Sequence, residues 1–287
     1  MQKDPAMIRD ILVHLDSSPG TPARLDLATD IARRLSAHLI GLHVVDVPLP
    51  VFAGADMSGG AATAELITAL RDDALEDARR SRPAFEEKMR REGISGEWRA
   101  PEGNAARQVA LHGRYVDLIV VGQLDPGGSN AAASAIVENA LFSTGRPVLV
   151  VPAIWTAGES IGRRALVTWN ASREAARAIS DALPLLAGAE SVTVLTINAE
   201  PTPEGHGEAP GADMAVHLAR HGLKVTLRRV AGAEIGAGDQ ILNEASDLGA
   251  DLIVMGGYGH SRWRELVLGG ATRSILGRMT APVLLSH

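Results

Sequence analysis

The chain is 287 residues long, which suits two domains, and its 34 acidic and 28 basic residues give a formal net charge of −6. This acidic balance argues against a general nucleic-acid binder, which needs a basic face to displace counterions from phosphates. The chain contains no cysteine, which excludes disulfides, thiolate nucleophiles and cysteine-based metal sites.

Hydropathy gives no sign of a membrane-associated chain. No apolar run approaches the roughly 20 residues of a membrane span. The charged N-terminal segment shows no apolar stretch before the first expected strand, so it lacks the pattern of a secretory signal. We therefore expect a cytoplasmic protein with neither a membrane nor a nucleic-acid partner.

Aliphatic runs and helical periodicities alternate along the first half of the chain. Strands are expected at Ile11–Leu15, His38–Val45, Gly96–Ala100, Leu118–Val121 and Val148–Val151. Helices are expected at Pro22–Ser36, Ala64–Glu92 and Asn104–His112, with a further helix before the last strand. The small residues of Gly54–Ala64, ahead of the long helix, predict a mobile loop.

The second half repeats this order of elements. Its strands are expected at Ala165–Trp169, Val192–Ile197, Lys224–Val230, Leu252–Met255 and Pro282–Ser286. Its helices are expected at Arg173–Leu186, Gly211–His221, Gly238–Leu248 and Ala271–Met279. Ser172 is a good N-cap for the first of these helices, and Pro184 is expected to kink it or end it early. Ser17 and Ser18 are interpreted similarly, as caps of the chain's first helix rather than as nucleophiles.

A short motif marks the same place in both halves. Asp117–Gly122 reads DLIVVG and Asp251–Gly256 reads DLIVMG, identical at five of six positions. A glycine-containing stretch, a helical pattern and a Pro-Val-Leu strand follow each copy. Self-similarity of this kind indicates a duplicated unit. We expect one unit over residues 1–153 and another over residues 164–287, joined by a short connector.

Alternating strands and helices predict an α/β protein in which each unit is a doubly wound, Rossmann-like sheet of five parallel strands. Ligand sites in such sheets lie beyond the C-terminal strand ends, where the strand order reverses. The last strands, Val148–Val151 and Val283–Leu285, are aliphatic edges that would promote aggregation if left unpaired. We expect them to pair across a pseudo-twofold axis within the chain, with a homodimer of two whole chains as the alternative.

A glycine-rich stretch follows the strand Leu252–Met255. Its glycines and the first residues of the next helix are Gly256, Gly259, Gly269, Gly270 and Thr272. Bare backbone amides and a helix N-terminus favour an anion there, while a tight turn is the alternative interpretation. His260 would lie close to such an anion or pack within the loop.

The spacing Gly-x2-Gly-x9-Gly resembles the nucleotide loop of the universal stress protein superfamily, in which a Ser or Thr follows. Trp169–Arg177 resembles the family as well, and the repeat extends the resemblance over nearly the whole chain as a tandem of two domains. The resemblance implies an adenine nucleotide alpha hydrolase-like fold and a role in the stress response. In nucleotide-binding members the loop holds the phosphates of ATP or another adenine nucleotide, and an Asp after the first strand holds the adenosine.

Neither unit carries the complete family set. In the second unit Gly270 stands where the Ser or Thr would be, with Thr272 two positions on, and Asn170 replaces the first-strand Asp. In the first unit Asp16 keeps that acid, but Asp125 replaces the second loop glycine and would repel a phosphate. We therefore expect the nucleotide, or another anion, in the second unit and a degenerate loop in the first. The expected binding residues are Gly256, Gly259, Gly269, Gly270, Thr272, Asn170 and His260.

No motif indicates strong catalysis, since the sequence lacks a nucleophile elbow, a P-loop and a Rossmann fingerprint. His217 and His221 share a helix face, but without an HExxH pattern surface histidines are favoured and no metal is expected. The sequence favours a non-enzymatic, nucleotide-responsive stress protein. The alternatives are a weak nucleotide hydrolase, with Glu265 as the carboxylate of the second loop, and a regulatory scaffold with empty sites.

Overall fold

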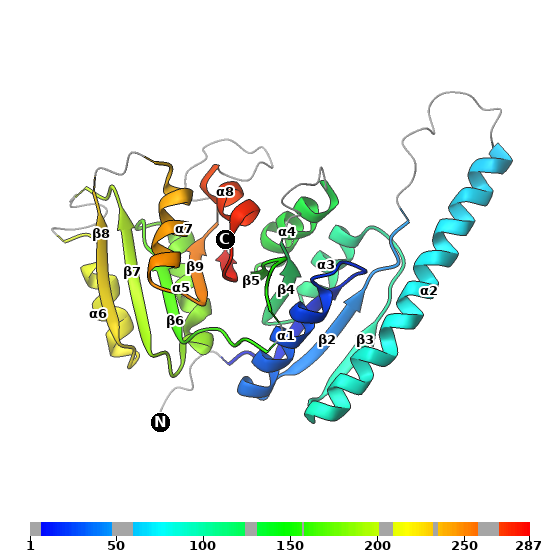
Figure 1. Ribbon diagram of the computed structural model, residues 1–287, viewed down its shortest axis with the longest axis horizontal. Coiled ribbons are helices and arrows are strands. Elements are labelled where there is room, and N and C mark those ends of the chain that lie inside the picture. The colour runs from blue at the N-terminus through cyan, green and yellow to red at the C-terminus, as the bar shows by residue number, and fades with distance from the viewer. Residues whose placement is uncertain are drawn as a thin grey trace.

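The computed structural model describes residues 7–47, 60–123, 131–156, 158–200, 209–231, 235–257 and 270–287. The first half contains β1 (Asp10–Leu15), α1 (Thr21–Leu35), β2 (His38–His43), α2 (Gly60–Glu92), β3 (Gly96–Arg99), α3 (Ala105–Gly113), β4 (Leu118–Gly122), α4 (Ala131–Thr144) and β5 (Val148–Val151). The second half contains β6 (Arg164–Thr168), α5 (Arg173–Leu186), β7 (Ser191–Ile197), α6 (Ala212–Arg220), β8 (Val225–Val230), α7 (Ala237–Asp247), β9 (Leu252–Gly256), α8 (Gly270–Arg278) and β10 (Val283–Ser286). Strands and helices alternate in both halves, as the sequence predicts (Figure 1).

The strands form one sheet in the order β3-β2-β1-β4-β5-β10-β9-β6-β7-β8. Within each half all pairings are parallel, and the strand order reverses between β1 and β4 and again between β6 and β9. This is the doubly wound arrangement, with helices on both faces, that the alternating pattern predicts. The expected fold class, two five-stranded units in tandem, is confirmed.

The two units meet at a seam between β5 and β10. These strands pair antiparallel, with Val283 opposite Val150 and Leu285 opposite Val148. Every residue of the two strands is at most 2% exposed. The two aliphatic edge strands therefore cover each other within one chain. This was expected, because unpaired edges of this kind promote aggregation.

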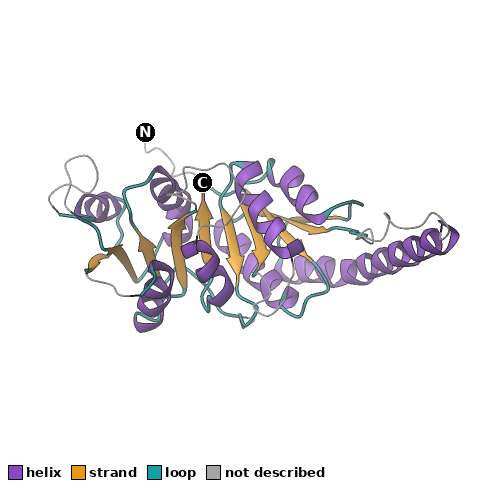
Figure 2. Cartoon of the chain, turned by 90° about the horizontal axis from the view of Figure 1, so that it is seen from above, coloured by secondary structure: helices purple, strands orange, loops and turns teal. Residues whose placement is uncertain are grey.

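Helices cover the sheet in two layers that run across both units (Figure 2). One core cluster joins the sheet to α1, α2, α5 and α6, with Leu27, Phe85 and Ile179 among its members. The other joins it to α3, α4, α7 and α8, with Val109 and Leu276 among its members. The apolar residues that recur at helical spacing in the sequence are the ones these helices bury.

One local expectation is wrong, and one of the two alternatives at Pro184 is excluded. Gly60 to Ala64 were expected in a mobile loop but form the start of α2, because alanine-rich sequence has high helix propensity; the rest of the Gly54–Ala64 segment lies outside the described residues. This end of α2 extends beyond the remainder of the first unit (Figures 1 and 2). Pro184 does not end α5, which continues to Leu186 with its apolar face buried, so packing outweighs the lost backbone hydrogen bond. Among the described residues, no helix has the length and apolar character needed to cross a bilayer.

The duplicated DLIV motif has a structural role at its first residue. The Asp117 carboxylate accepts hydrogen bonds from the backbone amides of Arg9 (2.9 Å) and Asp10 (3.1 Å). The Asp251 carboxylate accepts them from Gly162 (2.7 Å) and from the two residues that follow it. Each aspartate thus fastens the N-terminal ends of the two central strands of its unit to one another.

Candidate functional site

The second unit places both ends of the predicted loop at its strand-order reversal. Gly256 is the last residue of β9, and Asn170 follows the neighbouring strand β6. Gly270 is the first residue of α8, and Thr272 is buried in that helix's first turn. Gly259, Gly269 and His260 lie outside the described residues, as does the rest of 258–269.

Gly256 is packed against the start of α5. A Cβ atom added to it would lie 2.5 Å from the backbone nitrogen of Ala175 and 2.7 Å from the carbonyl carbon of Glu174. The amide of the next residue, Gly257, donates to the carbonyl of Ser286 at 2.8 Å. Gly256 therefore lets the end of β9 pack closely against the N-terminus of α5. The amide of Gly257 is not free for a ligand, because it is hydrogen-bonded to β10.

Asn170 and Ser172 connect β6 to α5. The Asn170 side-chain oxygen accepts from the amide of Ser172 at 3.2 Å, and the Ser172 hydroxyl accepts from the amide of Ala175 at 3.1 Å. The predicted N-cap at Ser172 is confirmed. Asn170 is exposed at the sheet edge, so its amide group remains accessible to a ligand.

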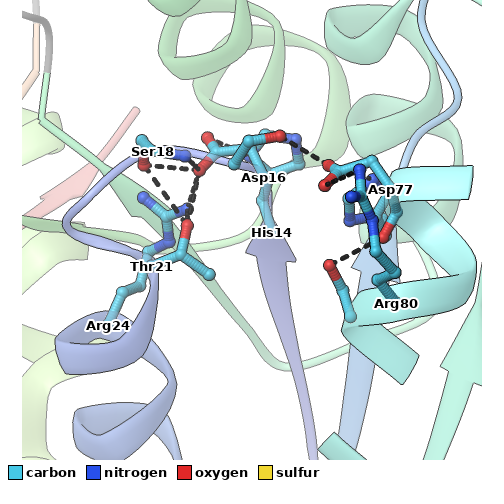
Figure 3. A network of polar contacts seen from close by, with 10 residues as sticks. His14, Asp16, Ser18, Thr21, Arg24, Asp77 and Arg80 are labelled. Atoms are coloured by element: carbon cyan, nitrogen blue, oxygen red, sulfur yellow. Dashed lines mark hydrogen bonds and ion pairs between the residues drawn. The ribbon is translucent and has the colours of Figure 1, made fainter. Parts of the chain in front are cut away.

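The first unit holds a polar network that the sequence did not lead us to expect (Figure 3). Asp16, directly after β1, is its centre. Its Oδ1 atom accepts from the backbone amide and hydroxyl of Ser18, from the hydroxyl of Thr21 and from Nη2 of Arg24 at 2.8 Å. Burial disfavours the charged carboxylate, but Arg24, His14 and the two hydroxyls outweigh it and hold the pKa of Asp16 well below its ordinary value.

Arg24 fills the space that a ligand loop would need. Its side chain is 4% exposed although it lies on helix α1. A Cβ atom added to Gly122, the counterpart of Gly256, would lie 2.0 Å from its Nη1 atom. Its Nε atom has no hydrogen-bond partner among the described residues. The guanidinium thus occupies the place next to β4 where, in the second unit, β9 approaches a helix backbone.

His14 lies beneath Asp16, near the end of β1 (Figure 3). Its Nδ1 atom is 3.7 Å from Asp16 Oδ2, and the side chain is 6% exposed. Burial first, and the nearby Arg24 second, lower the pKa of His14 to about 4, although Asp16 opposes the shift. The imidazole is therefore neutral at neutral pH.

A second group joins β2 to α2. His43 Nε2 lies 3.5 Å from Oδ2 of Asp77, and the Ser17 hydroxyl donates to the same oxygen. The cap role expected for Ser17 and Ser18 is wrong, because Gly20 is the N-cap of α1 and makes no side-chain cap. Both hydroxyls instead donate to nearby carboxylates, Ser17 to Asp77 and Ser18 to Asp16.

Two cavities flank this network. One, of about 400 Å³, lies between Asp16, Arg24, Gly122 and Ile136. The other, of about 420 Å³, lies between β1, β2 and α2 and shares His14 and Asp16 with the first. Both have the size of small-molecule sites. The sequence does not predict these cavities, because His14, His43 and Asp77 are far apart in the chain. The one signal that could have indicated them is the pair of histidines that interrupt two otherwise aliphatic strands.

Other features of the structure are weaker candidates for a functional site. A cavity of about 640 Å³ lies at the opposite edge of the second unit, beside the connector, but the Asp251 carboxylate there is occupied by backbone amides. His217 and His221 stack edge to face with ring centroids 4.8 Å apart. In the described part of the chain, no group of three or more His, Asp or Glu side chains is arranged to hold a metal ion.

Comparison with known proteins identifies the family. The model of the universal stress protein family matches residues 162–287. The second unit is therefore a universal stress protein domain. No curated protein matches the chain. Among solved structures, it is similar to a universal stress protein from Archaeoglobus fulgidus, with 17% identity, a TM-score of 0.74, and coverage of 98% of this chain and 96% of that one. A protein of unknown function from Pseudomonas aeruginosa shares 17% identity over 97% of this chain and 92% of its own, with a TM-score of 0.56.

These full-length similarities concern the fold. They extend over both units, so the tandem arrangement expected from the repeat is confirmed.

Proposed function

We propose that this universal stress protein serves the stress response by binding a nucleotide, ATP or another adenine nucleotide, or a different anion, in its second unit without strong catalysis. The observation that carries the proposal is the position of the glycine loop. Its described ends, Gly256 and Gly270, flank the strand-order reversal of β6 and β9. Sites for phosphate-bearing ligands in open α/β sheets are found at this point.

The helices around the loop provide favourable electrostatics for an anion. The N-terminus of α5 lies directly at Gly256, and α8 begins at Gly270, near which no described atom lies within 4 Å of an added Cβ position. Unpaired amides and the helix dipole at such ends favour negative charge. Among the described residues, the atoms nearest an added Cβ at Gly256 belong to Glu174 and Ala175 at the start of α5, whereas the first unit places Arg24 next to Gly122.

Asn170 and the loop residues would bind different parts of the nucleotide. We expect the backbone of Gly256, Gly259, Gly269 and Gly270 to hold the phosphates. Asn170, in the place of the family's aspartate, would contact the nucleoside. Thr272 and His260 would lie close to the phosphates.

The first experiment measures the nucleotide content of the purified protein by chromatography after denaturation, followed by titration with ATP. We expect bound nucleotide without steady product release. Steady release of product would instead support the weak hydrolase. No binding with ATP in large excess would support a scaffold with empty sites and contradict the proposal.

The second experiment is Gly259→Asp, which copies Asp125 of the first unit. A carboxylate among the phosphate-binding amides should lower ATP affinity by about 100-fold or more, because like charges at contact distance repel strongly in a partly dry site. Gly277→Asp, near the far end of α8 with open space around the added atoms, has the same charge change and should alter affinity little. Equal affinity in wild type and Gly259→Asp would refute the loop assignment.

A further inference from the structure

The cavity of about 420 Å³ in the first unit has an unusual lining. Four carboxylates line it, from Asp16, Asp46, Asp73 and Asp77, and its described lining includes no lysine or arginine. Val44 and Ile136 are among the apolar side chains of its wall. An open cavity with this lining repels phosphate and attracts a positively charged molecule with an apolar body.

Hydrogen-bond acceptors outnumber donors around this cavity. Asp46 accepts from the amide of Ala105 at 2.8 Å, and Asp77 accepts from the hydroxyl of Ser17. Arg24 is already bound to Asp16, and Arg80 reaches Asp77 only at 3.9 Å from an exposed position. An ionised carboxylate has no hydrogen to donate, and these described donors are already used, so an incoming molecule would have to bring donors of its own.

His43 adds an acceptor that is independent of the carboxylates. Its side chain is 5% exposed, and its Nε2 atom faces Asp77, which favours the tautomer protonated on Nε2. Burial lowers the pKa of His43, although Asp77 and Asp16 oppose the shift, so Nδ1 carries a free lone pair at neutral pH. Nδ1 is buried and has no partner among the described residues, a state that costs free energy until a donor arrives.

We propose that the first unit binds a small organic cation in this cavity, a primary ammonium on a short aliphatic chain. The ammonium would donate to the carboxylates of Asp73 and Asp77 and, once the imidazole turns to bring its buried Nδ1 atom to the cavity, to His43, with the chain against Val44 and Ile136. A polyatomic cation suits the site better than a metal ion, because the described side chains form no metal-binding group. The unit with the degenerate phosphate loop would thus bind a ligand of opposite charge to that proposed for the second unit.

The test titrates the full chain with 1,4-diaminobutane in a calorimeter at neutral pH. We expect saturable binding at one site, and none for 1,4-butanediol, which has a similar length and no charge. Asp73→Asn should lower the affinity about tenfold or more. Asp73 is exposed and has no described partner, so this variant should fold normally. Glu76→Gln carries the same charge change on the outer face of α2, where Glu76 pairs with Arg79 at 3.7 Å, and should bind as wild type does.

Nitrogen-15 NMR of the histidine side chains gives a second readout on the unmodified chain. The Nδ1 resonance of His43 should move on addition of 1,4-diaminobutane, while those of the exposed His217 and His221 should not. Several outcomes would overturn the proposal: no saturable binding, equal loss in Asp73→Asn and Glu76→Gln, or an unmoved His43 resonance. Saturable binding of Mg²⁺ that Asp73→Asn abolishes would show a metal site instead.

Discussion

The two units share a fold but end their central strands in different ways. After β1, Asp16 binds Arg24 and two hydroxyls, whereas after β6, Asn170 makes a single bond to the backbone of Ser172. At the end of β4, Gly122 packs against a guanidinium, whereas at the end of β9, Gly256 packs against the backbone of α5. The difference shows that duplicated sheets preserve backbone geometry while the chemistry of their strand ends diverges.

The largest expected effect is a difference in stability between the alanine variants of Gly256 and Gly122. Gly256→Ala should lower the free energy of unfolding by about 3 kcal/mol, because its Cβ would meet fixed backbone atoms 2.5 Å and 2.7 Å away. Gly122→Ala should cost about 1 kcal/mol, because the atom in the way ends a long side chain that can rotate. Urea unfolding of both variants measures the difference. Equal losses would show that Arg24 is as immobile as the α5 backbone.

A second expected effect lies in the acid sensitivity of the first unit. The pKa of His14 is about 4 in the folded protein against 6.5 ordinarily, so between these values the unfolded chain binds more protons and stability rises with pH. This contribution is complete above pH 6.5 and is lost as the pH falls toward 4, a change of at most about 3 kcal/mol.

His14→Gln keeps a polar side chain of similar size and should flatten the dependence of unfolding free energy on pH between 6.5 and 4. The second unit has Thr168 at the corresponding position and no such titration. His217→Gln, on an exposed surface, is the control and should leave the profile unchanged. A profile as steep in His14→Gln as in wild type would contradict the assignment to His14.

The smallest of the three effects concerns the residue after the first strand. Asp16→Asn removes the charge that balances the buried Arg24 and should cost about 2 kcal/mol, less than for a fully buried pair because the Asp16 side chain is 39% exposed. The reciprocal Asn170→Asp should change stability by no more than about 0.5 kcal/mol, because Asn170 is exposed and no guanidinium faces it among the described residues. Thermal unfolding of both variants tests this asymmetry.

Sequence reasoning predicted the elements well because their signals are local. The aliphatic run of β4 and the helical spacing in α1 each indicate an element within a short window. Pro184 and Gly60 to Ala64 misled because tertiary packing and helix propensity outweighed a proline and a run of small residues.

The polar network of the first unit could not be predicted from such local signals. Its members come from β1, β2, α1 and α2, and Asp77 is 61 positions after Asp16 in a helix rich in charged residues. No spacing rule connects them. The second unit's loop was found because its glycines lie within one short stretch of the sequence, although their effect on a ligand depends on residues outside the described part.

The antiparallel seam has a consequence for how the molecule can communicate. Because β5 and β10 run in opposite directions, the C-terminal strand ends of the two units emerge at opposite rims, too far apart for one small molecule to touch both. The helices span the distance instead. α8 starts at the second unit's rim and ends where Gln123, at the first unit's rim, donates to the Leu276 carbonyl at 3.0 Å. In return, Leu141 near the end of α4 lies against Gly257 at the second rim. Each of these two helices therefore reaches from one rim of the sheet to the other.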